Sequence, residues 1–387
     1  MSRILTLNTG SSSLKFGLYE EAAEPELILR GQIDGMSHEA RLIIIDDAGT
    51  KTAQDVAAAS TTPADAIEHV VGALRSEIPG LTIAGVGHRI VHGGPDYAAP
   101  MVLTPDVLER LAEFSPLAPL HQPHNLAGVE AAHRAFPGSV QVGCFDTAFH
   151  RGHPWVNDTF AIPRSFYDEG IRRYGFHGLS YDYVTGVIEA EHPQLHRGRI
   201  VIAHLGNGAS MCAVRDGRSV GSTMGFSALD GLPMGTRCGQ IDPGVLLYLI
   251  EGRGMAPGAV LEMLYKQSGL LGLSNLSSDM RTLLASDSAE AAEAIDYFVF
   301  RARREIGAMS AVLGGIDALV FCGGIGENAA PIRARIVEGL AYLGLEIDPL
   351  ENARNAQEIG AGRTRVMVIP TDEERIIARA VGNWLRQ

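Results

Sequence analysis

The sequence of 387 residues is poor in lysine, carries a formal net charge of −13 and has no long apolar run, and each shortage excludes a class of protein. Only three lysines occur, whereas nucleic-acid binding needs clustered positive charge. No segment approaches the roughly 18 consecutive apolar residues of a membrane-spanning helix. The first residues show neither the hydrophobic segment nor the cleavage site of a secretory signal. We therefore expect a cytoplasmic protein with no membrane or nucleic-acid partner.

The familiar cysteine and nucleotide-binding motifs are also missing. The four cysteines, Cys144, Cys212, Cys238 and Cys322, have no spacing typical of zinc or redox sites. Three of them lie in apolar, strand-like segments, where a thiol packs as a small hydrophobic group. There is no Gly-x-x-x-x-Gly-Lys-Ser/Thr sequence, and no Gly-x-Gly-x-x-Gly follows a strand. These absences exclude a P-loop enzyme and leave other glycine-rich turns as candidates for phosphate binding.

Two segments of the chain have the same form: an apolar strand, a turn rich in glycine and small polar residues, and a returning strand. Arg3 corresponds to Arg199 and Gly10 to Gly206, at a constant offset of 196 residues. The strand, turn and strand cover residues 4–7, 8–13 and 14–19 in the first half, and 200–203, 204–210 and 211–214 in the second.

The likeness between the two halves extends beyond the hairpins. Each hairpin is followed by an apolar strand that runs into glycines, at 83–91 and at 316–322. Each half then has a late strand that leads to a carboxylate, 140–145 before Asp146 and 366–369 before 372–374. Three similarities in the same order indicate an ancient duplication and therefore two similar domains.

Helical patterns lie between the predicted strands. Residues 64–77 carry apolar positions at helical spacing, and 105–114 follow a Thr104 N-cap with proline at the first helical position. A long helix is predicted over 288–313 and a last helix over 373–385. Strands that alternate with helices predict an α/β fold with a mostly parallel, covered sheet in each half. We expect residues 121–173, rich in His, Pro and Gly, to form loops and short helices.

Three turns are candidates for binding phosphate, because glycine-rich turns expose backbone N–H groups. They are Asn8–Ser13, Gly206–Ser210 and Gly323–Asn328, and each follows an apolar strand. Any one of them could be an ordinary tight turn, but three in equivalent places favour a nucleotide site.

The motifs around these turns resemble those of the acetate kinase family, within the acetate and sugar kinase, heat-shock protein and actin superfamily. The matching motifs run from one end of the chain to the other: LNTGSSSLKF, GHRIVHGG, LAPLHQPHN, FDTAFH, RYGFHGLS, AHLGNGAS, GLPMGTRCGQIDPG, LSSDMR, CGGIGEN and IPTDEER. The resemblance implies two duplicated actin-like (ribonuclease H-like) domains, each a mixed sheet flanked by helices, with the active-site cleft between them. The first would comprise residues 1–147 plus 374–387, with the C-terminal helix folded back. The second, 148–373, would bind nucleotide and form a homodimer.

The resemblance also implies a reaction, the reversible Mg²⁺-dependent transfer of the γ-phosphoryl group of ATP to acetate, giving acetyl phosphate and ADP. Mn²⁺ is an alternative metal, and another short carboxylate is an alternative acceptor. Such an acceptor is already deprotonated, so the site must supply alignment and positive charge rather than a strong base. We expect direct in-line transfer without a phosphoenzyme.

The family motifs assign roles to individual residues. By resemblance, Arg89 binds the acid's carboxylate, Arg237 neutralises the transferring phosphoryl group, and His177 donates a hydrogen bond to it. Asp146 is the family's essential carboxylate, and we expect it to hold an arginine or a metal-bound water. The other implied residues are Val91, Leu120 and Phe176 in the acid pocket; Asn8 and Glu373 as metal ligands; His121 in a positioning role; and Lys15, His204, Leu205, Gly206, Asn207, Gly208, Asp279, Met280, Arg281, Gly324, Ile325, Gly326, Glu327 and Asn328 at the nucleotide.

Two other functions remain open at this stage. Many family members have proline where this chain has Ala228, and the smaller side chain could admit a longer acid, as in a propionate or butyrate kinase. A different class is an actin- or heat-shock-type protein that uses ATP only to change shape. Both arginines and His177 argue against that class, because a shape switch needs no acid pocket.

Overall fold

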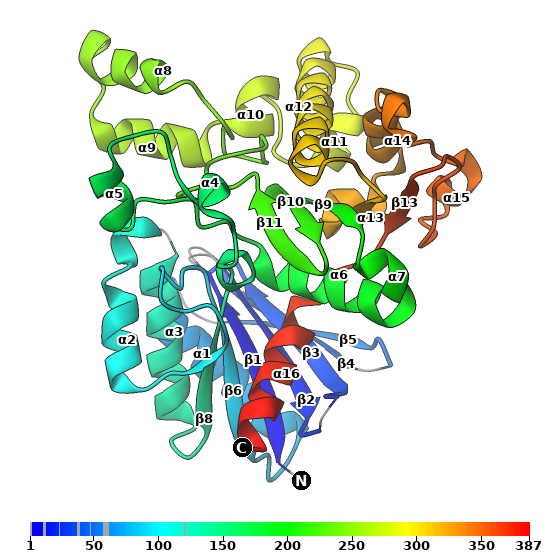
Figure 1. Ribbon diagram of the computed structural model, residues 1–387. Helices are drawn as coiled ribbons and strands as arrows, with labels where there is room; N and C mark the ends of the chain where they lie inside the picture. Colours follow the sequence, from blue (N-terminus) through cyan, green and yellow to red (C-terminus); the bar gives the residue numbers. More distant parts are fainter. Residues whose placement is uncertain are drawn as a thin grey trace. The chain divides into compact units, whose positions relative to one another are not determined.

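The computed structural model describes residues 2–10, 13–22, 24–36, 39–46, 48–56, 62–119 and 121–387, which form two compact units (Figure 1). Unit 1 contains the described residues of Met1–Phe149 together with Asp372–Gln387, and unit 2 is His150–Thr371. The chain thus begins and ends in unit 1. Both units combine strands and helices, as predicted, but the expectation of a mostly parallel sheet in each half is wrong, because hairpin strands add antiparallel pairs to both sheets.

Unit 1 is built on an eight-stranded sheet with the order β5-β4-β3-β2-β1-β6-β8-β7. Its strands are β1 (Arg3–Thr9), β2 (Ser13–Glu20), β3 (Leu27–Asp34), β4 (Arg41–Asp46), β5 (Lys51–Asp55), β6 (Ile83–Ile90), β7 (Met101–Val102) and β8 (Val140–Phe145). Its helices of eight or more residues are α1 (Pro63–Glu77), α2 (Pro105–Ala112), α3 (Gln122–Ala135) and α16 (Glu373–Leu385). β1, β6 and β8 are parallel, so their carboxyl ends meet at one edge of the sheet.

Helices cover both faces of the sheet in unit 1. The apolar residues of α1 and α3, among them Ile67, Val70 and Ala132, share one buried cluster with Leu5 and Phe16 of the strands. The C-terminal helix α16 packs on the other face, against β1, β6 and β8. Burial of these apolar faces is the main favourable contribution to folding of the unit.

Two glycines of β6 allow α16 to lie close to the sheet. A methyl group on Gly85 would lie 2.4 Å from Cγ1 of Val381, and one on Gly87 would lie 2.3 Å from Cγ2 of Ile377. Both distances are far below van der Waals contact, so any larger residue would push the helix away. The close fit fixes α16, and with it the side chains at the start of the helix.

Unit 2 is built on a five-stranded sheet with the order β11-β10-β9-β12-β13. The strands are β9 (Arg199–Leu205), β10 (Ala209–Arg215), β11 (Arg218–Ser222), β12 (Ala318–Cys322) and β13 (Arg365–Val368). The helices are α4 (Trp155–Asp158), α5 (Arg164–Asp168), α6 (Gly178–Glu191), α7 (Pro193–His196), α8 (Pro243–Leu247), α9 (Pro257–Lys266), α10 (Gly269–Ser274), α11 (Met280–Leu284), α12 (Ala289–Leu313), α13 (Gly323–Asn328), α14 (Ala330–Glu338) and α15 (Pro349–Ala353).

The two sheets share one topology. In unit 1, β3, β2 and β1 pair antiparallel in turn, and β6 and β8 follow in parallel. In unit 2, β11, β10 and β9 pair antiparallel, and β12 and β13 follow in parallel. This identical order confirms the duplication that the repeated hairpins predict.

Local signals in the sequence account for several helix boundaries. Thr62 forms a capping box with Asp65 at the start of α1, and Thr104 caps α2 as predicted. Ser288 caps the 25-residue helix α12, whose buried face includes Ile295 and Phe298. Cys144, Cys212 and Cys322 are buried in strands, as expected for structural thiols. Among the described residues, no helix is both long enough and apolar enough to cross a membrane.

Two expectations about secondary structure are wrong. The segment 121–173 contains the 14-residue helix α3, and not only loops and short helices, because Pro123 occupies the first turn, where its missing N–H costs nothing. The glycine-rich segment Gly323–Asn328 is the short helix α13 rather than a turn, because Gly323 adopts a positive φ of 74° that redirects the chain straight from β12 into the helix.

Buried His88 should make the stability of the protein depend on pH. His88 is 2% exposed on β6, and its Nε2 lies 2.7 Å from Oε1 of Gln141. Burial lowers the pKa of His88 from 6.5 to about 4. A lowered pKa means that its full stabilisation is present above pH 6.5 and is lost as the pH falls toward 4. Between pH 7 and pH 5, His88 should lower the free energy of unfolding by about 2 kcal/mol.

Urea denaturation of the protein and of His88→Gln at pH 7 and pH 5 measures this effect. Glutamine stays neutral and can still bond Gln141, so the variant should lose less free energy of unfolding across this pH range than the parent. Equal losses in the two proteins would show that His88 does not titrate as its burial implies.

Candidate active site

In unit 1, three charged side chains meet at the carboxyl edge of the parallel strands. Arg89 is near the end of β6, Asp146 follows β8 directly, and the pairing of Arg89 with Cys144 brings the two ends together. Arg89 donates from Nε to Oδ1 of Asp146 at 2.8 Å and from Nη2 to Oδ2 at 2.7 Å. Its Nη1 lies 3.2 Å from Oε2 of Glu373, the first residue of α16. The sheet and the C-terminal helix thus jointly fix one guanidinium.

The charges of this triad explain its pKa shifts. Burial alone would lower the pKa of Arg89, but the carboxylates of Asp146 and Glu373 outweigh it and raise the pKa, so Arg89 stays charged. Burial raises the pKa of Asp146 against the opposing effect of Arg89. With one cation facing two carboxylates, the ionised triad carries a net negative charge. A bidentate pair of this kind favours Asp146 as a group that holds Arg89.

Asn8 and Lys15 face each other across the first hairpin. They are paired residues of β1 and β2, next to the turn whose Ser11 and Ser12 lie outside the described residues. Lys15 also lines a cavity of about 350 Å³ with Tyr19, Arg30 and Glu374. Burial, followed by the charge of Glu373, raises the pKa of Glu374, and Lys15 opposes this shift. The structure thus places Lys15 beside the start of α16.

Two polar side chains of α3, to which the family motifs assign no role, bond the backbone at the ends of β1 and β6. Asn125 donates to the carbonyl of Thr9 at 2.6 Å and accepts from the N–H of Val91 at 3.0 Å, so it joins the ends of β1 and β6. Gln122 bonds both the N–H and the C=O of His92. His121 stands just before this helix. Both residues belong to the motif LAPLHQPHN. Their burial and their bonds to residues 91 and 92 depend on contacts far apart in the chain, which the motif does not indicate.

The oxygen donors of unit 1 suit a hard divalent cation. Mg²⁺ takes one or two carboxylates and otherwise keeps water and substrate oxygens. Asn8 offers an amide oxygen, and Glu373 offers a carboxylate within the negatively charged triad. The residues placed by the structure include no group of three or more His, Cys, Asp or Glu that could hold a metal ion. The donor set therefore fits a weakly held, water-rich Mg²⁺ better than a closed protein cage.

In unit 2, His177 and Arg237 converge over the turn between β9 and β10. A methyl group on Gly208 would lie 3.1 Å from Nε2 of His177 and 3.8 Å from Nη2 of Arg237. The turn is closed by the bond from the N–H of Gly206 to the carbonyl of Gly208 at 3.0 Å. Because Gly208 has no side chain, the space between its backbone and the nitrogens of His177 and Arg237 stays open.

His177 is held in an unusual conformation by its neighbours. Its φ of 57° is left-handed, which for a residue other than glycine marks strain that often accompanies function. Its Nδ1 lies 2.8 Å from Oγ of Ser210, which also bonds the hydroxyl of Tyr181. Its ring stacks on His204 with centroids 4.3 Å apart. Burial raises the pKa of Tyr181 well above its ordinary value, so the phenol stays protonated.

The segments predicted to contact nucleotide are fixed by polar side chains. Glu327 accepts from the N–H groups of Gly323 and Thr371. Fully buried Arg333 donates to the carbonyls of Gly326 and Glu327, and burial lowers its pKa to about 10. Asp279 caps α11 and pairs with Arg281, whose side chain is exposed. These bonds hold the ends of α11 and α13 in defined conformations.

The predicted acid-pocket residues belong to different parts of the chain. Val91 follows β6 in unit 1, and Phe176 is buried in unit 2 beside His177. Leu120 lies outside the described residues. The carbonyl of Ala228 accepts from Nη1 of Arg237 at 3.0 Å. Ala228 therefore contacts Arg237 through its backbone.

Comparison with known proteins supplies an independent identification. Residues 3–379 match the acetokinase family. A protein of Methylocella silvestris named acetate kinase is 52% identical, over 98% of this chain and 97% of its own length. Among solved structures, a propionate kinase of Francisella tularensis has a TM-score of 0.92 at 36% identity, over 98% of this chain and 99% of its own. The acetate kinase of Porphyromonas gingivalis has a TM-score of 0.89 at 34% identity, over the whole of both chains.

These matches agree with the duplicated fold and with the arginine, histidine and glycine-rich motifs described above. Each of them spans nearly the whole chain rather than one unit. The chain therefore belongs to the acetokinase family, whose members are kinases that use ATP to phosphorylate a carboxylate.

Proposed function

We propose that the chain transfers the γ-phosphoryl group of ATP reversibly to acetate, giving acetyl phosphate and ADP. The observation that best supports this proposal is the convergence of His177 and Arg237 over Gly208. Two donors aimed at one glycine turn suit a group whose charge is spread over several oxygens. The 52% identity to an acetate kinase over nearly the whole chain supports acetate as the acceptor.

The proposed transfer needs no proton donor or acceptor. An oxygen of the acetate carboxylate forms a bond to the γ-phosphorus, and the bond from that phosphorus to the bridging oxygen breaks. The electron pair leaves with ADP, so atoms and charge balance in a single in-line step. Arg237 and His177 would stabilise the equatorial oxygens while the bonds change. The catalytic demand is therefore position and charge, and Asp146 has no proton to move.

Arg89 is the proposed binding group for the acid. Its bonds to Asp146 and its contact with Glu373 involve Nε and one N–H on each terminal nitrogen. A guanidinium has five N–H donors, and these contacts with described residues account for three of them. An edge of the guanidinium with two N–H donors matches the two oxygens of a carboxylate. Asp146 would then hold Arg89 with that edge presented to the substrate.

Asn8 and Glu373 are the proposed ligands of Mg²⁺, with Mn²⁺ as an alternative. When bound, the metal would offset the negative charge of the nucleotide's phosphates. The hydrogen-bonded frames of Gly206–Gly208, of α11 and of α13 would then contact the nucleotide, together with Lys15 and His204.

A longer acid, such as propionate, is the alternative acceptor, because the solved structure of a propionate kinase resembles this chain with a TM-score of 0.92. Alanine in place of proline at 228 also leaves a smaller side chain. The test supplies ATP and Mg²⁺ with acetate, propionate or butyrate, and traps the product with hydroxylamine. It shows whether an acyl phosphate forms and which acid is preferred. Highest kcat/KM with acetate supports the proposal. Formation of ADP that does not depend on any acid would indicate an ATP-driven shape switch instead.

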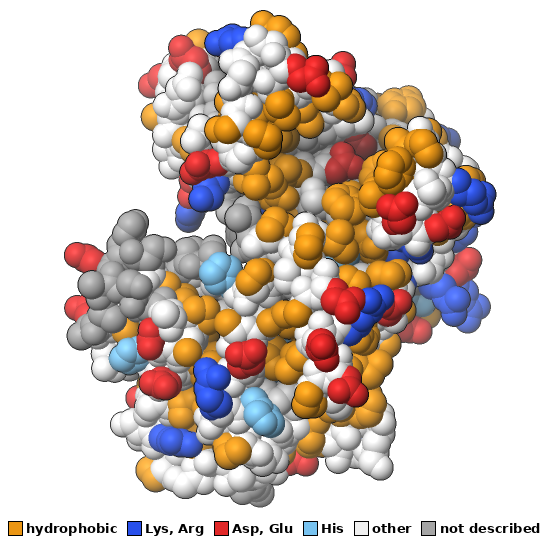
Figure 2. All heavy atoms as spheres, turned by 90° about the vertical axis from the view of Figure 1, so that its left-hand side faces the viewer, with side chains coloured by type: hydrophobic (Ala, Val, Ile, Leu, Met, Phe, Trp, Pro, Cys, Tyr) orange, Lys and Arg blue, Asp and Glu red, His pale blue; other side chains and the backbone are white. Residues whose placement is uncertain are grey.

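We also propose that two copies of the chain associate through unit 2, in the cytoplasm. Large hydrophobic side chains are exposed on this unit, and Figure 2 shows such side chains gathered at the surface. Those on α8, α9, α10 and α12, or directly after α8 or α10, are Val245, Leu247, Tyr248, Leu261, Leu273, Leu276, Tyr297, Phe300 and Val312. A surface of this kind on a stable protein is typical of an interface.

The two arginines should affect different kinetic constants. Arg89→Ala should mainly raise KM for the acid, because a ground-state contact is lost, whereas Arg237→Ala should mainly lower kcat. Steady-state kinetics with acetate and ATP varied separately measures both. An unchanged KM for acetate in Arg89→Ala would remove Arg89 from the acid site.

Ser210 should matter through its bond to His177. Ser210→Ala removes the bonds of that hydroxyl to His177 and to Tyr181, and the loss of the bond to His177 should lower kcat about tenfold with little change in either KM. Ser310→Ala is the matched control, because Ser310 is also buried and its hydroxyl donates to the carbonyl of Ile306 in its own helix, far from His177 in sequence. Equal kcat values in the two variants would show that Ser210 has no special role.

Glu373 should set the metal requirement. Glu373→Ala removes a charged oxygen ligand, so more Mg²⁺ should be needed for half-maximal activity. A Mg²⁺ titration of the variant measures this, with Glu20→Ala as a control because Glu20 lies at the far end of the first hairpin, paired with Arg3. Superimposable titrations of Glu373→Ala and the parent would contradict the assignment.

A further inference from the structure

Arg237 lies in a closed loop, residues 231–240, here called the Arg237 loop. The N–H of Gln240 donates to the carbonyl of Gly231 at 2.9 Å, and this bond closes the neck of the loop. Within it, the N–H of Met234 donates to the carbonyl of Arg237 at 3.0 Å. Backbone bonds to residues 207, 264, 268, 270 and 271 hold the middle of the loop, and the closing bond holds its ends, so the neck is one of the two places that fix Arg237.

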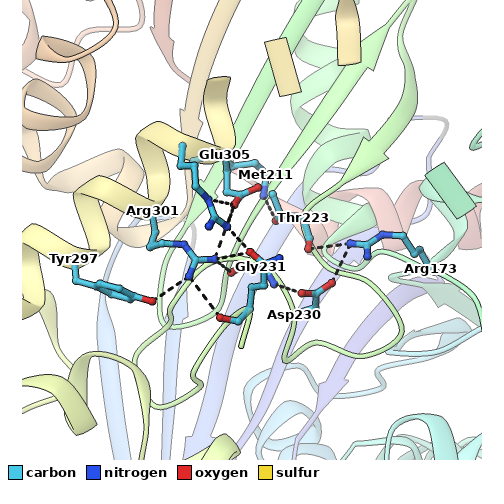
Figure 3. Close-up of polar contacts among 10 residues, drawn as sticks. Arg173, Met211, Thr223, Asp230, Gly231, Tyr297, Arg301 and Glu305 are labelled. Carbon is cyan, nitrogen blue, oxygen red and sulfur yellow. Dashed lines mark hydrogen bonds and ion pairs between the residues drawn. The ribbon is translucent and has the colours of Figure 1, made fainter. Parts of the chain in front are cut away.

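One buried arginine of α12 holds both ends of the loop. Arg301 is 5% exposed, and Figure 3 shows its guanidinium directed at the neck. Its Nη2 donates to the carbonyl of Gly231 at 3.1 Å and to Oε1 of Gln240 at 3.2 Å. Its Nη1 donates to the hydroxyl of Tyr297 at 3.0 Å and lies 3.5 Å from the carbonyl of Gln240. The planar fork holds Tyr297 with one terminal nitrogen while the other contacts both ends of the loop, and a single lysine ammonium lacks this fixed arrangement of donors.

The charge of Arg301 is balanced within its own helix. Oε1 of Glu305, one turn further along α12, lies 3.9 Å from Nη2 of Arg301. The same carboxylate oxygen accepts from Nε of Arg304 at 3.1 Å. Arg301 therefore contacts the loop mainly as a hydrogen-bond donor to neutral oxygens, and Glu305 supplies the opposite charge.

The other side of the neck is fixed by the segment that leads to His177. The N–H of Gly231 donates to Oδ1 of Asp230 at 2.8 Å, and Oδ2 of Asp230 accepts from Nη2 of Arg173 at 2.9 Å (Figure 3). Gly231 has a φ of 93°, and a methyl group there would lie 2.7 Å from the carbonyl oxygen of Thr223. Both polar atoms of Gly231 are thus held, one from each side.

We propose that Arg301 is a positioning residue for phosphoryl transfer, because it fixes the neck of the Arg237 loop and thereby the place of the Arg237 guanidinium relative to His177. The inference rests on the proposed function, since that function gives Arg237 its role in the transition state. Preorganised donors must be placed finely, and a displacement of 1 Å can cost about 100-fold in rate.

Replacing Arg301 should leave the fold intact. The carbonyl of Gly231 keeps its bond from the N–H of Gln240, and Glu305 keeps its bond from Arg304. Methionine has a similar length and is tolerated in irregular apolar surroundings. The loop would then remain closed but would be less firmly fixed.

Steady-state kinetics of Arg301→Met and Arg301→Lys test the proposal. In both variants kcat should fall about 10- to 100-fold, while KM for ATP and for acetate should change less than about threefold. Lysine keeps the charge but loses the fork, so a similar loss in both variants assigns the effect to geometry. If Arg301→Met does not fold, Arg301→Lys carries the test. Wild-type kcat in the folded variants, or a change confined to KM, would overturn the proposal.

Arg303→Met is the matched control on the same helix. Arg303 donates from Nε to the carbonyl of Arg335 at 3.0 Å, so it holds α14 rather than the Arg237 loop. Its kcat should stay near that of the parent. A loss equal to that of Arg301→Met would mean that any such arginine of α12 has the same effect, and the proposal would fail.

A double-mutant cycle separates positioning from general damage. If Arg301 acts through Arg237, adding Arg301→Met to Arg237→Ala should lower the residual kcat less than about twofold. Full additivity would overturn the inference. Faster amide hydrogen exchange confined to residues 231–240 in Arg301→Met would support it. A parent protein that forms no acyl phosphate would contradict the proposed function. An active parent with an equally active Arg301→Met would contradict only the inference about Arg301.

Discussion

The paired contact of Arg89 with Asp146 is the interaction on which the rest of unit 1 is arranged. The donor Arg89 and the acceptor Asp146 come from the ends of adjacent parallel strands, so the register of β6 and β8 sets their distance. The pair is largely buried, and removing one partner would leave an uncompensated charge, which is far more costly than never having buried the pair. The same cost makes the site rigid, because neither side chain can turn away.

In unit 2, buried arginines are also fixed by hydrogen bonds, but their acceptors are mainly backbone carbonyl oxygens and not carboxylates. Arg301 holds the neck of the Arg237 loop, and Arg333 holds the end of α13. An arginine remains charged when buried and offers five donors in a fixed plane, so one side chain can satisfy several backbone carbonyls that no regular element pairs. Loops held in this way gain a defined geometry without becoming helices or strands.

Much of the fold is visible in the sequence, because its signals are local. The apolar runs of β6 and β8, the Thr104 cap of α2 and the repeated hairpins all depend on residues close to one another. Strands β3 to β5 were not foreseen. β5 is exposed along its whole length and therefore lacks the alternation that marks a half-buried strand. Partners far apart in the chain were equally invisible: Arg301 bonds Gly231 across 70 positions, and Asn125 bonds Thr9 across 116. The motif resemblance singled out the residues proposed to touch substrate, and Asp146 as a group that holds an arginine, but not Arg301 or Asn125.

The position of α16 has a consequence for biosynthesis. The helix that covers one face of the first sheet, against Gly85 and Gly87, follows unit 2 in the chain and therefore leaves the ribosome after it. Domains generally fold as units during synthesis, beginning with the N-terminal one. Here one apolar face of the first sheet stays uncovered until all of unit 2 has been translated. Because the same helix carries Glu373, a chain without α16 lacks both the covering of its first sheet and a proposed metal ligand.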